Sequence, residues 1–348
     1  MKKNMKVIVS IITLVVIAAI FAFNQYDKKG VYSTTNYYLD TVNEISVINV
    51  RKSKADKILP GADKVVLDIN NAMSSHLPSS EVSKINDNAG ISPVKVSNDT
   101  FKVIQKSIAY SKLTNGKFDI AIGPLTSMWN IGNDKARVPE KSEIDKALPL
   151  INSDNIILNS KNTTVYLKEK GMKLDLGGIA KGYCADKVAE YLKENGVDNA
   201  IVNLGGNIYV MGKNEVKKDF VVGIQNPLQK SSDSMASVKL SNKSIVTSGI
   251  YERFLEKDGK IYHHMLDPDT GYPFDNELSS VTIFSDKSVD GDALSTSIYG
   301  LGLENGMKKV KSMDGIDAVF ITKDNKVYIT DGIRKDFKIL DDKYTLVN

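Results

Sequence analysis

The feature of the sequence that most constrains its fold is a predicted strand that runs through two adjacent glycines directly into a helix. Residues 173–178 predict the end of this strand, and residues 179–195 carry apolar side chains at helical spacing. Gly196 closes the helix as a typical C-cap, and two short strands are predicted at 200–204 and 208–211. Strands and helices interleave without a strict βαβ rhythm, which predicts an α+β fold rather than a doubly wound one.

Weaker patterns on either side predict further elements. The length of 348 residues suits one large domain or two closely packed lobes. The predicted elements are a linker from residue 31, a strand at 44–50, a helix at 61–74, a helix at 99–114 capped by Asn98 or Asp99, and a hairpin over 318–330 that turns at 323–326.

The N-terminus predicts a membrane segment. Residues 7–23 carry no charge, and three lysines precede them, which places the N-terminus in the cytoplasm by the positive-inside rule. A cleaved signal peptide is the alternative, but no clean small-x-small cleavage site follows the apolar stretch. We therefore expect a membrane anchor or uncleaved signal over residues 1–29. A folded domain over 30–348 is then expected at the cell membrane, outside the cytoplasm.

Charge and cysteine content narrow the possible functions. The chain has 46 Lys and Arg against 42 Asp and Glu, and residues 1–29 account for the whole excess of +4. The remainder is balanced, which argues against a nucleic-acid partner, because such a partner needs clustered uncompensated cations. The single cysteine, Cys184, cannot form an intramolecular disulfide and is predicted to be an apolar core residue of the helix.

The glycine turn is a candidate phosphate site. Gly177 and Gly178 lead into a helix N-terminus, where free backbone N–H groups and the helix dipole favour an anion. Lys181 could add a positive charge, and Asp175 could accept a hydrogen bond from a ribose or a base. The alternative is a tight turn that needs glycine for its geometry alone.

Two of the three histidines stand next to each other at 263 and 264, before an Asp-Pro-x-Thr-Gly turn at 267–271. Adjacent residues of a strand point to opposite faces, so at most one histidine would face a given pocket. One of them could donate to phosphate oxygens or serve as an acid or base. A hairpin connection with an incidental histidine explains the pattern equally well.

A third candidate combines a carboxylate and a hydroxyl. Asp292 and Thr296 are four residues apart and would share one face of a helix. These hard oxygen ligands suit Mg²⁺, which usually completes its coordination with water and substrate phosphates. A diphosphate that reaches both this helix and the glycine turn would complete such a site. Capping of the helix by Asp290 or Asp292 is the simpler alternative.

Together these motifs resemble the ApbE-type FAD:protein FMN transferase family. The resemblance runs from about residue 36 to the C-terminus and rests on several motifs in order. The motifs are Met73-Ser74, Ser80-Glu81, Asn86, Phe118-Asp119, Gly123-Pro124-Leu125, Trp129, 175–186, 203–207, Ser248-Gly249, Tyr251-Glu252-Arg253, His264, Asp267-Pro268, Thr270-Gly271, Pro273 and 292–296.

The resemblance implies a single large domain of mixed sheets with packed helices, with an FAD cleft between two lobes. It implies an Mg²⁺-dependent enzyme that attaches FMN from FAD to a Ser or Thr hydroxyl of a separate exported protein and releases AMP. Metal contacts would come from the Gly178 carbonyl, Asp292, Ser295 and Thr296. Cofactor contacts would come from Asp119, Asp175, Lys181, His264 and Leu266, and the candidate bases are His264 and Asp292.

Some residues depart from the family pattern. No cysteine follows the apolar segment to carry a lipid, and His76 and Leu39 stand where relatives often have Tyr or Trp and Met. Two other functions fit the same motifs, namely an FAD pyrophosphatase that gives FMN and AMP, and a surface protein that binds FAD without turnover.

Overall fold

The computed structural model describes residues 12–17, 27–227 and 233–348. Within these ranges a nine-stranded sheet forms the centre of the molecule, in the order β1-β2-β6-β7-β10-β13-β14-β15-β17. All neighbouring strands of this sheet are antiparallel except β15 and β17. Its strands are β1 (Lys29–Tyr38), β2 (Thr41–Arg51), β6 (Ala200–Leu204), β7 (Asn207–Met211), β10 (Lys243–Gly249), β13 (Leu278–Ser285), β14 (Asp317–Thr322), β15 (Lys326–Ile329) and β17 (Thr345–Leu346).

Three smaller sheets and the α-helices complete the described fold. The smaller sheets are β3 (Val94–Lys95) with β5 (Thr164–Leu167) and β4 (Ile156–Asn159), β16 (Phe337–Ile339) with β9 (Ser234–Leu240) and β8 (Phe220–Gln225), and β11 (Phe254–Lys257) with β12 (Lys260–His263). Within residues 27–227 and 233–348 the helices are α2 (Lys52–Met73), α3 (Glu81–Asp87), α4 (Asn98–Leu113), α5 (Gly123–Trp129), α6 (Lys141–Ala147), α7 (Ala180–Glu194) and α8 (Ser288–Lys311). The predicted α+β class is therefore confirmed.

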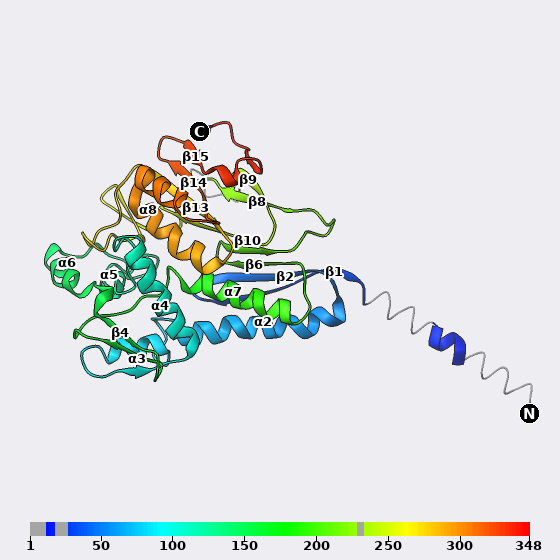
Figure 1. The fold of residues 1–348 in the computed structure, drawn as a ribbon, viewed down its shortest axis with the longest axis horizontal. Coiled ribbons are helices and arrows are strands. Elements are labelled where there is room, and N and C mark those ends of the chain that lie inside the picture. Colours follow the sequence, from blue (N-terminus) through cyan, green and yellow to red (C-terminus); the bar gives the residue numbers. More distant parts are fainter. Residues whose placement is uncertain (1–11, 18–26, 228–232) are drawn as a thin grey trace, which may run out of the picture.

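Helices α2 and α7 lie side by side against the sheet, and α8 packs beside α7 (Figure 1). Their apolar faces meet the strands in one large core, in which Val66 of α2, Val188 of α7 and Val202 of β6 are fully buried. Burial of this kind is the main source of stability for a chain without disulfides. Cys184 is fully buried on α7, as predicted, and burial raises the pKa of its thiol.

The predicted elements with the strongest patterns are confirmed. The helix after the glycine turn, the β6–β7 hairpin and the β14–β15 hairpin occur within a few residues of their predicted bounds. The predicted helix at 99–114 is α4, but Ser97 is its cap, because the Ser97 hydroxyl accepts from the Thr100 N–H. The expected caps Asn98 and Asp99 are already helical, and so that detail was wrong.

Three predictions fail for identifiable reasons. Residues 31–38 are not a linker but part of edge strand β1, which pairs with β2 along its whole length. The helix expected from residue 61 begins at Lys52, because Pro60 is accommodated inside α2 rather than at its start. Residues 173–178 form no strand, since their only sheet-like contact is an isolated bridge between Lys173 and Ile122.

The membrane prediction lies largely outside the described residues. Of the stretch 7–23, the structure describes only residues 12–17. Across residues 12–17, 27–227 and 233–348, no helix combines the length and the apolar character that crossing a membrane requires.

Candidate active site

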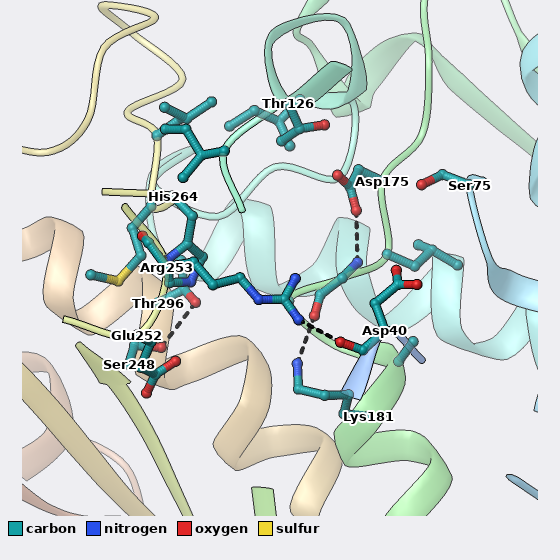
Figure 2. A pocket seen from close by; sticks show the side chains of 18 of the residues that line it. Asp40, Ser75, Thr126, Asp175, Lys181, Ser248, Glu252, Arg253, His264 and Thr296 are labelled. Atoms are coloured by element: carbon teal, nitrogen blue, oxygen red, sulfur yellow. Dashed lines mark hydrogen bonds between the residues drawn. The ribbon is translucent and has the colours of Figure 1, made fainter. Parts of the chain in front are cut away.

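A cavity of about 1200 Å³ opens between the end of the large sheet and the segments around α3 and α5. The glycine turn, the first turns of α8, the β1–β2 turn and the segment between β10 and β12 all contribute to its lining. Figure 2 shows side chains from these separate parts of the chain converging on one space. Of the predicted site residues, all except Ser295 line this cavity.

The glycine turn is fixed by its own side chains. The Asp175 carboxylate accepts from the Gly177 N–H at 2.8 Å, and the Lys181 ammonium donates to the Gly177 carbonyl at 2.9 Å. A Cβ on Gly178 would lie 3.2 Å from the Phe118 ring and 4.0 Å from the Thr296 hydroxyl. A side chain here would be tight against the Phe118 ring, and the backbone of the turn lies close to Thr296 of α8.

Asp292 is a buried carboxylate that points from α8 to the start of α7. It is 4% exposed, and its Oδ2 accepts from the Gly182 N–H at 2.8 Å. Its Oδ1 lies 3.6 Å from the Lys181 ammonium. The simpler alternative of capping its own helix is wrong. The backbone N–H groups of Ser288 and Val289 at the start of α8 donate instead to Asp186 of α7.

The hydroxyl groups near Asp292 differ in their availability. The Ser295 hydroxyl donates to the Asp292 carbonyl at 2.9 Å and accepts from Ser248 at 2.8 Å, and it faces away from the cavity. The Thr296 hydroxyl lines the cavity and is 3.2 Å from the Ser248 hydroxyl. Thr296 is therefore placed for a ligand, whereas Ser295 supports the helix turn that carries it.

The donor set fits Mg²⁺ better than a softer metal. Among the described residues, no group of three or more His, Cys, Asp and Glu could hold a metal ion by itself. The Gly178 carbonyl, the Asp292 carboxylate and the Thr296 hydroxyl are hard oxygen donors, and together they carry a single negative charge. Such a set leaves the remaining coordination positions of Mg²⁺ to water and to the phosphate oxygens of a ligand.

The two histidines lie in different surroundings, as the strand pattern predicted. His263 is buried, its Nε2 is 2.9 Å from the Phe274 carbonyl, and burial lowers its pKa to about 4. His264 lines the cavity, and its Nδ1 is 3.2 Å from the Arg253 carbonyl. Enclosure lowers the pKa of His264 to about 4 as well. Because a carbonyl can only accept, Nδ1 carries the proton, and Nε2 is left with a free lone pair.

Asp119 and Leu266 line the cavity, but their strongest contacts are with the protein. The Asp119 carboxylate accepts from the backbone N–H groups of Ala121 at 2.8 Å and of Ser153 at 2.9 Å. Burial raises its pKa, and these N–H donors oppose that shift. Leu266 is 5% exposed and packs in the small core around Trp129, which is fully buried, as expected for a core residue.

Two charged residues of the cavity belong to the Tyr251-Glu252-Arg253 motif, but the sequence analysis assigned neither of them a role in the site. Glu252 lines the cavity with its side chain exposed, and the cavity walls that displace bulk water raise its pKa to about 7, an effect that Lys181 and Arg253 oppose. The Arg253 guanidinium donates to the Asp40 carbonyl at 2.9 Å and so spans from the β10–β11 connection to the β1–β2 turn (Figure 2). Adjacent charges in a turn carry no signal that separates a cavity wall from an exposed loop.

Comparison with known proteins places the chain among relatives of one family. The model of the ApbE family matches residues 39–320. A protein of Klebsiella pneumoniae named FAD:protein FMN transferase is 40% identical over 77% of this chain and 83% of its own length. A protein of Treponema pallidum with the same name is 35% identical over 79% of each chain.

Solved structures give the same result. The ApbE protein of Thermotoga maritima has a TM-score of 0.80 and 31% identity, over 87% of this chain and 97% of that one. The flavin transferase ApbE of Vibrio cholerae has a TM-score of 0.80 and 26% identity, over 88% and 99%.

Proposed function

The chain belongs to the ApbE family, and we propose that it transfers FMN from FAD to a Ser or Thr hydroxyl of a separate acceptor protein in an Mg²⁺-dependent reaction. Its relatives at 40% and 35% identity are FAD:protein FMN transferases, which assigns the class of enzyme. The observation that carries the finer proposal is the meeting of the Gly178 turn with Asp292 and Thr296 in one cavity.

The reaction exchanges one phosphorus–oxygen bond for another. The acceptor hydroxyl oxygen bonds to the phosphorus of the FMN half, the bond from that phosphorus to the bridging oxygen breaks, and AMP leaves. Mg²⁺, held by the Gly178 carbonyl, Asp292 and Thr296, would neutralise charge on the diphosphate. Lys181 adds a positive charge at the same end of the cavity, 3.6 Å from Asp292.

The proton of the attacking hydroxyl needs an acceptor, and His264 suits this role better than Asp292. One oxygen of Asp292 is bonded to the Gly182 N–H, and the other faces Lys181. The Nε2 of His264 has a free lone pair, because the Arg253 carbonyl holds the proton on Nδ1. The low pKa of His264 keeps the ring neutral at pH 7, in the form that accepts a proton.

We also propose that the acceptor is an exported protein and that the enzyme acts at the membrane, outside the cytoplasm. The support is the charge and apolar pattern of residues 1–29, in which lysines precede an uncharged stretch.

A mass measurement on the acceptor tests the proposal. The full chain is incubated with FAD, Mg²⁺ and a candidate acceptor protein, and we expect an FMN-sized mass gain on the acceptor with one AMP released per transfer. Omission of Mg²⁺, and replacement of the acceptor Ser or Thr by Ala, are the controls and should abolish the gain. Release of AMP without a mass gain would favour FAD hydrolysis, and tight FAD binding without either product would leave a binding protein.

A further inference from the structure

Helices α7 and α8 cap each other. The Asp292 carboxylate of α8 accepts from the Gly182 N–H in the first turn of α7, at 2.8 Å. In return, the Asp186 carboxylate of α7 accepts from the N–H groups of Ser288 and Val289 at the start of α8, at 2.7 and 3.0 Å. A helix N-terminus leaves its first N–H groups without partners inside the helix, and here each helix supplies a carboxylate to the other.

The two helices also touch at their backbones, so the paired caps fix a close contact. A Cβ on Gly182 would lie 2.3 Å from the Ser288 carbonyl oxygen and 2.7 Å from the Asp292 Cβ. Ser288 is fully buried, and its hydroxyl donates to Asn207 of β7 and accepts from Ser244 of β10. The start of α8 is therefore attached to both α7 and the sheet, and Asp186 makes the attachment to α7.

We propose that Asp186 is a positioning residue for the metal site, which holds α8 in the register that brings Asp292 and Thr296 to the Gly178 carbonyl. This inference rests on the proposed function, because it concerns the Mg²⁺ site that the function requires. Asp186 itself does not line the cavity. It acts through the helix that carries two of the metal ligands, in the way that outer hydrogen-bond partners orient metal ligands elsewhere.

A second carboxylate provides a matched control. Asp290 stands in the first turn of α8, where it accepts from the Lys106 ammonium and the Tyr110 hydroxyl of α4, both at 2.7 Å. Asp186 and Asp290 therefore both stabilise the start of α8 with a buried or half-buried carboxylate. Of these two carboxylates, only Asp186 joins α8 to α7, the helix that follows the glycine turn.

The Mg²⁺ dependence of FAD binding distinguishes a positioning role of Asp186 from a general effect on the stability of the protein. We compare the full chain with its Asp186→Asn and Asp290→Asn variants at pH 8, without acceptor protein, and follow flavin fluorescence as Mg²⁺ is added. We expect Asp186→Asn to raise the Mg²⁺ concentration for half-maximal FAD binding about tenfold, as is typical for loss of an outer partner of a metal ligand. Asp290→Asn should leave that midpoint unchanged, although both variants lower the melting temperature.

Equal Mg²⁺ midpoints for Asp186→Asn and the unchanged chain would overturn the inference, as would equal shifts for both variants. If Asp186→Asn does not fold, Asp186→Glu is compared with Asp290→Glu. Each of these variants keeps the charge and displaces the carboxylate by one methylene. A shifted Mg²⁺ midpoint in Asp186→Glu alone again supports the inference. The measurement needs no acceptor, so failure of FMN transfer would overturn the proposed function while leaving this result intact.

Discussion

The two walls of the cavity differ in how far burial and hydrogen bonds fix their side chains. The α7–α8 wall holds Asp292 almost fully buried, and reciprocal carboxylates satisfy the first turns of both helices. The opposite wall consists of the β1–β2 turn and the segment that carries Glu252, Arg253 and His264, where the Arg253 contact with the Asp40 carbonyl joins the two parts.

This contrast matches the two kinds of substrate in the proposed reaction. A diphosphate and a metal are small and invariant, and a preorganised site binds them best because no reorganisation is needed during reaction. An acceptor protein must enter and leave, which favours a wall of turns whose side chains remain exposed. Substitutions in the α7–α8 wall should therefore lower both the transfer rate and the stability, whereas substitutions in the opposite wall should have smaller effects.

Replacement of Asp292 should have the largest effect, because its carboxylate serves both the predicted metal site and the contact between α7 and α8. Asp292→Ala takes away the only carboxylate of the predicted metal site and leaves the Gly182 N–H without its acceptor. Loss of several kcal/mol of transition-state stabilisation corresponds to a fall in transfer rate of about a thousandfold. The rate of FMN transfer at saturating FAD measures this effect. Ser297→Ala on the same helix, whose hydroxyl bonds only to its own helix, is the control and should retain activity; full activity of Asp292→Ala would refute the metal assignment.

Separation of the two helices should have an intermediate effect. In Gly182→Ala the added Cβ meets the Ser288 carbonyl and Asp292, so the helices must move apart. Overpacking of this kind lowers the free energy of unfolding by about 1–3 kcal/mol. Urea denaturation measures the loss. Gly30→Ala in β1, where a Cβ would lie no closer than 3.6 Å to the Tyr32 ring, is the control and should have little effect. A stability equal to that of the unchanged chain would show that the helices are not in fixed contact.

A change in the opposite wall should have the smallest effect, and it should depend on pH. Glu252 is exposed to the solvent of the cavity, but the surrounding cavity walls still raise its pKa from 4.5 to about 7, so the folded state favours the protonated carboxyl. The stability that this group contributes is complete below about pH 4.5 and is lost as the pH rises through 7. Glu252→Gln should therefore melt at a slightly higher temperature than the unchanged chain at pH 8, and this difference should disappear near pH 4.5. Glu256→Gln, on β11 and outside the cavity lining, is the control; a gain that does not change with pH would contradict the assignment.

Local patterns were enough to predict much of the fold. The helix at 180–194 and the β6–β7 hairpin follow from spacing and from glycines within a short window. Strand β1 was missed because its polar, tyrosine-rich sequence shows no apolar alternation, and pairing with β2 is what makes it a strand. The start of α2 was hidden by Pro60, whose helical position only tertiary packing supports.

The residues of the candidate site were predictable only where a short sequence motif suggested a chemical role for them. The glycine turn, Asp292 and His264 belong to short patterns with a recognisable purpose, and the structure places all of them on one cavity. Asp186 and Glu252 also stand within motifs of the resemblance, but the sequence assigned no chemistry to them, because their partners lie elsewhere in the chain. Asp186 and the Ser288 N–H that it accepts from are 102 residues apart in the sequence, and a local charge pattern cannot predict a contact over that distance.

Long separation in sequence between the parts of the site also determines when the proposed metal site can form during synthesis. The Gly182 amide and its carboxylate are 110 residues apart, so a chain synthesised from its N-terminus carries the glycine turn long before α8 exists. Until α8 arrives, the turn has backbone donors but no metal ligands from a second helix. A growing chain should thus lack the proposed metal site until residues 288–311 have been synthesised and have docked as α8.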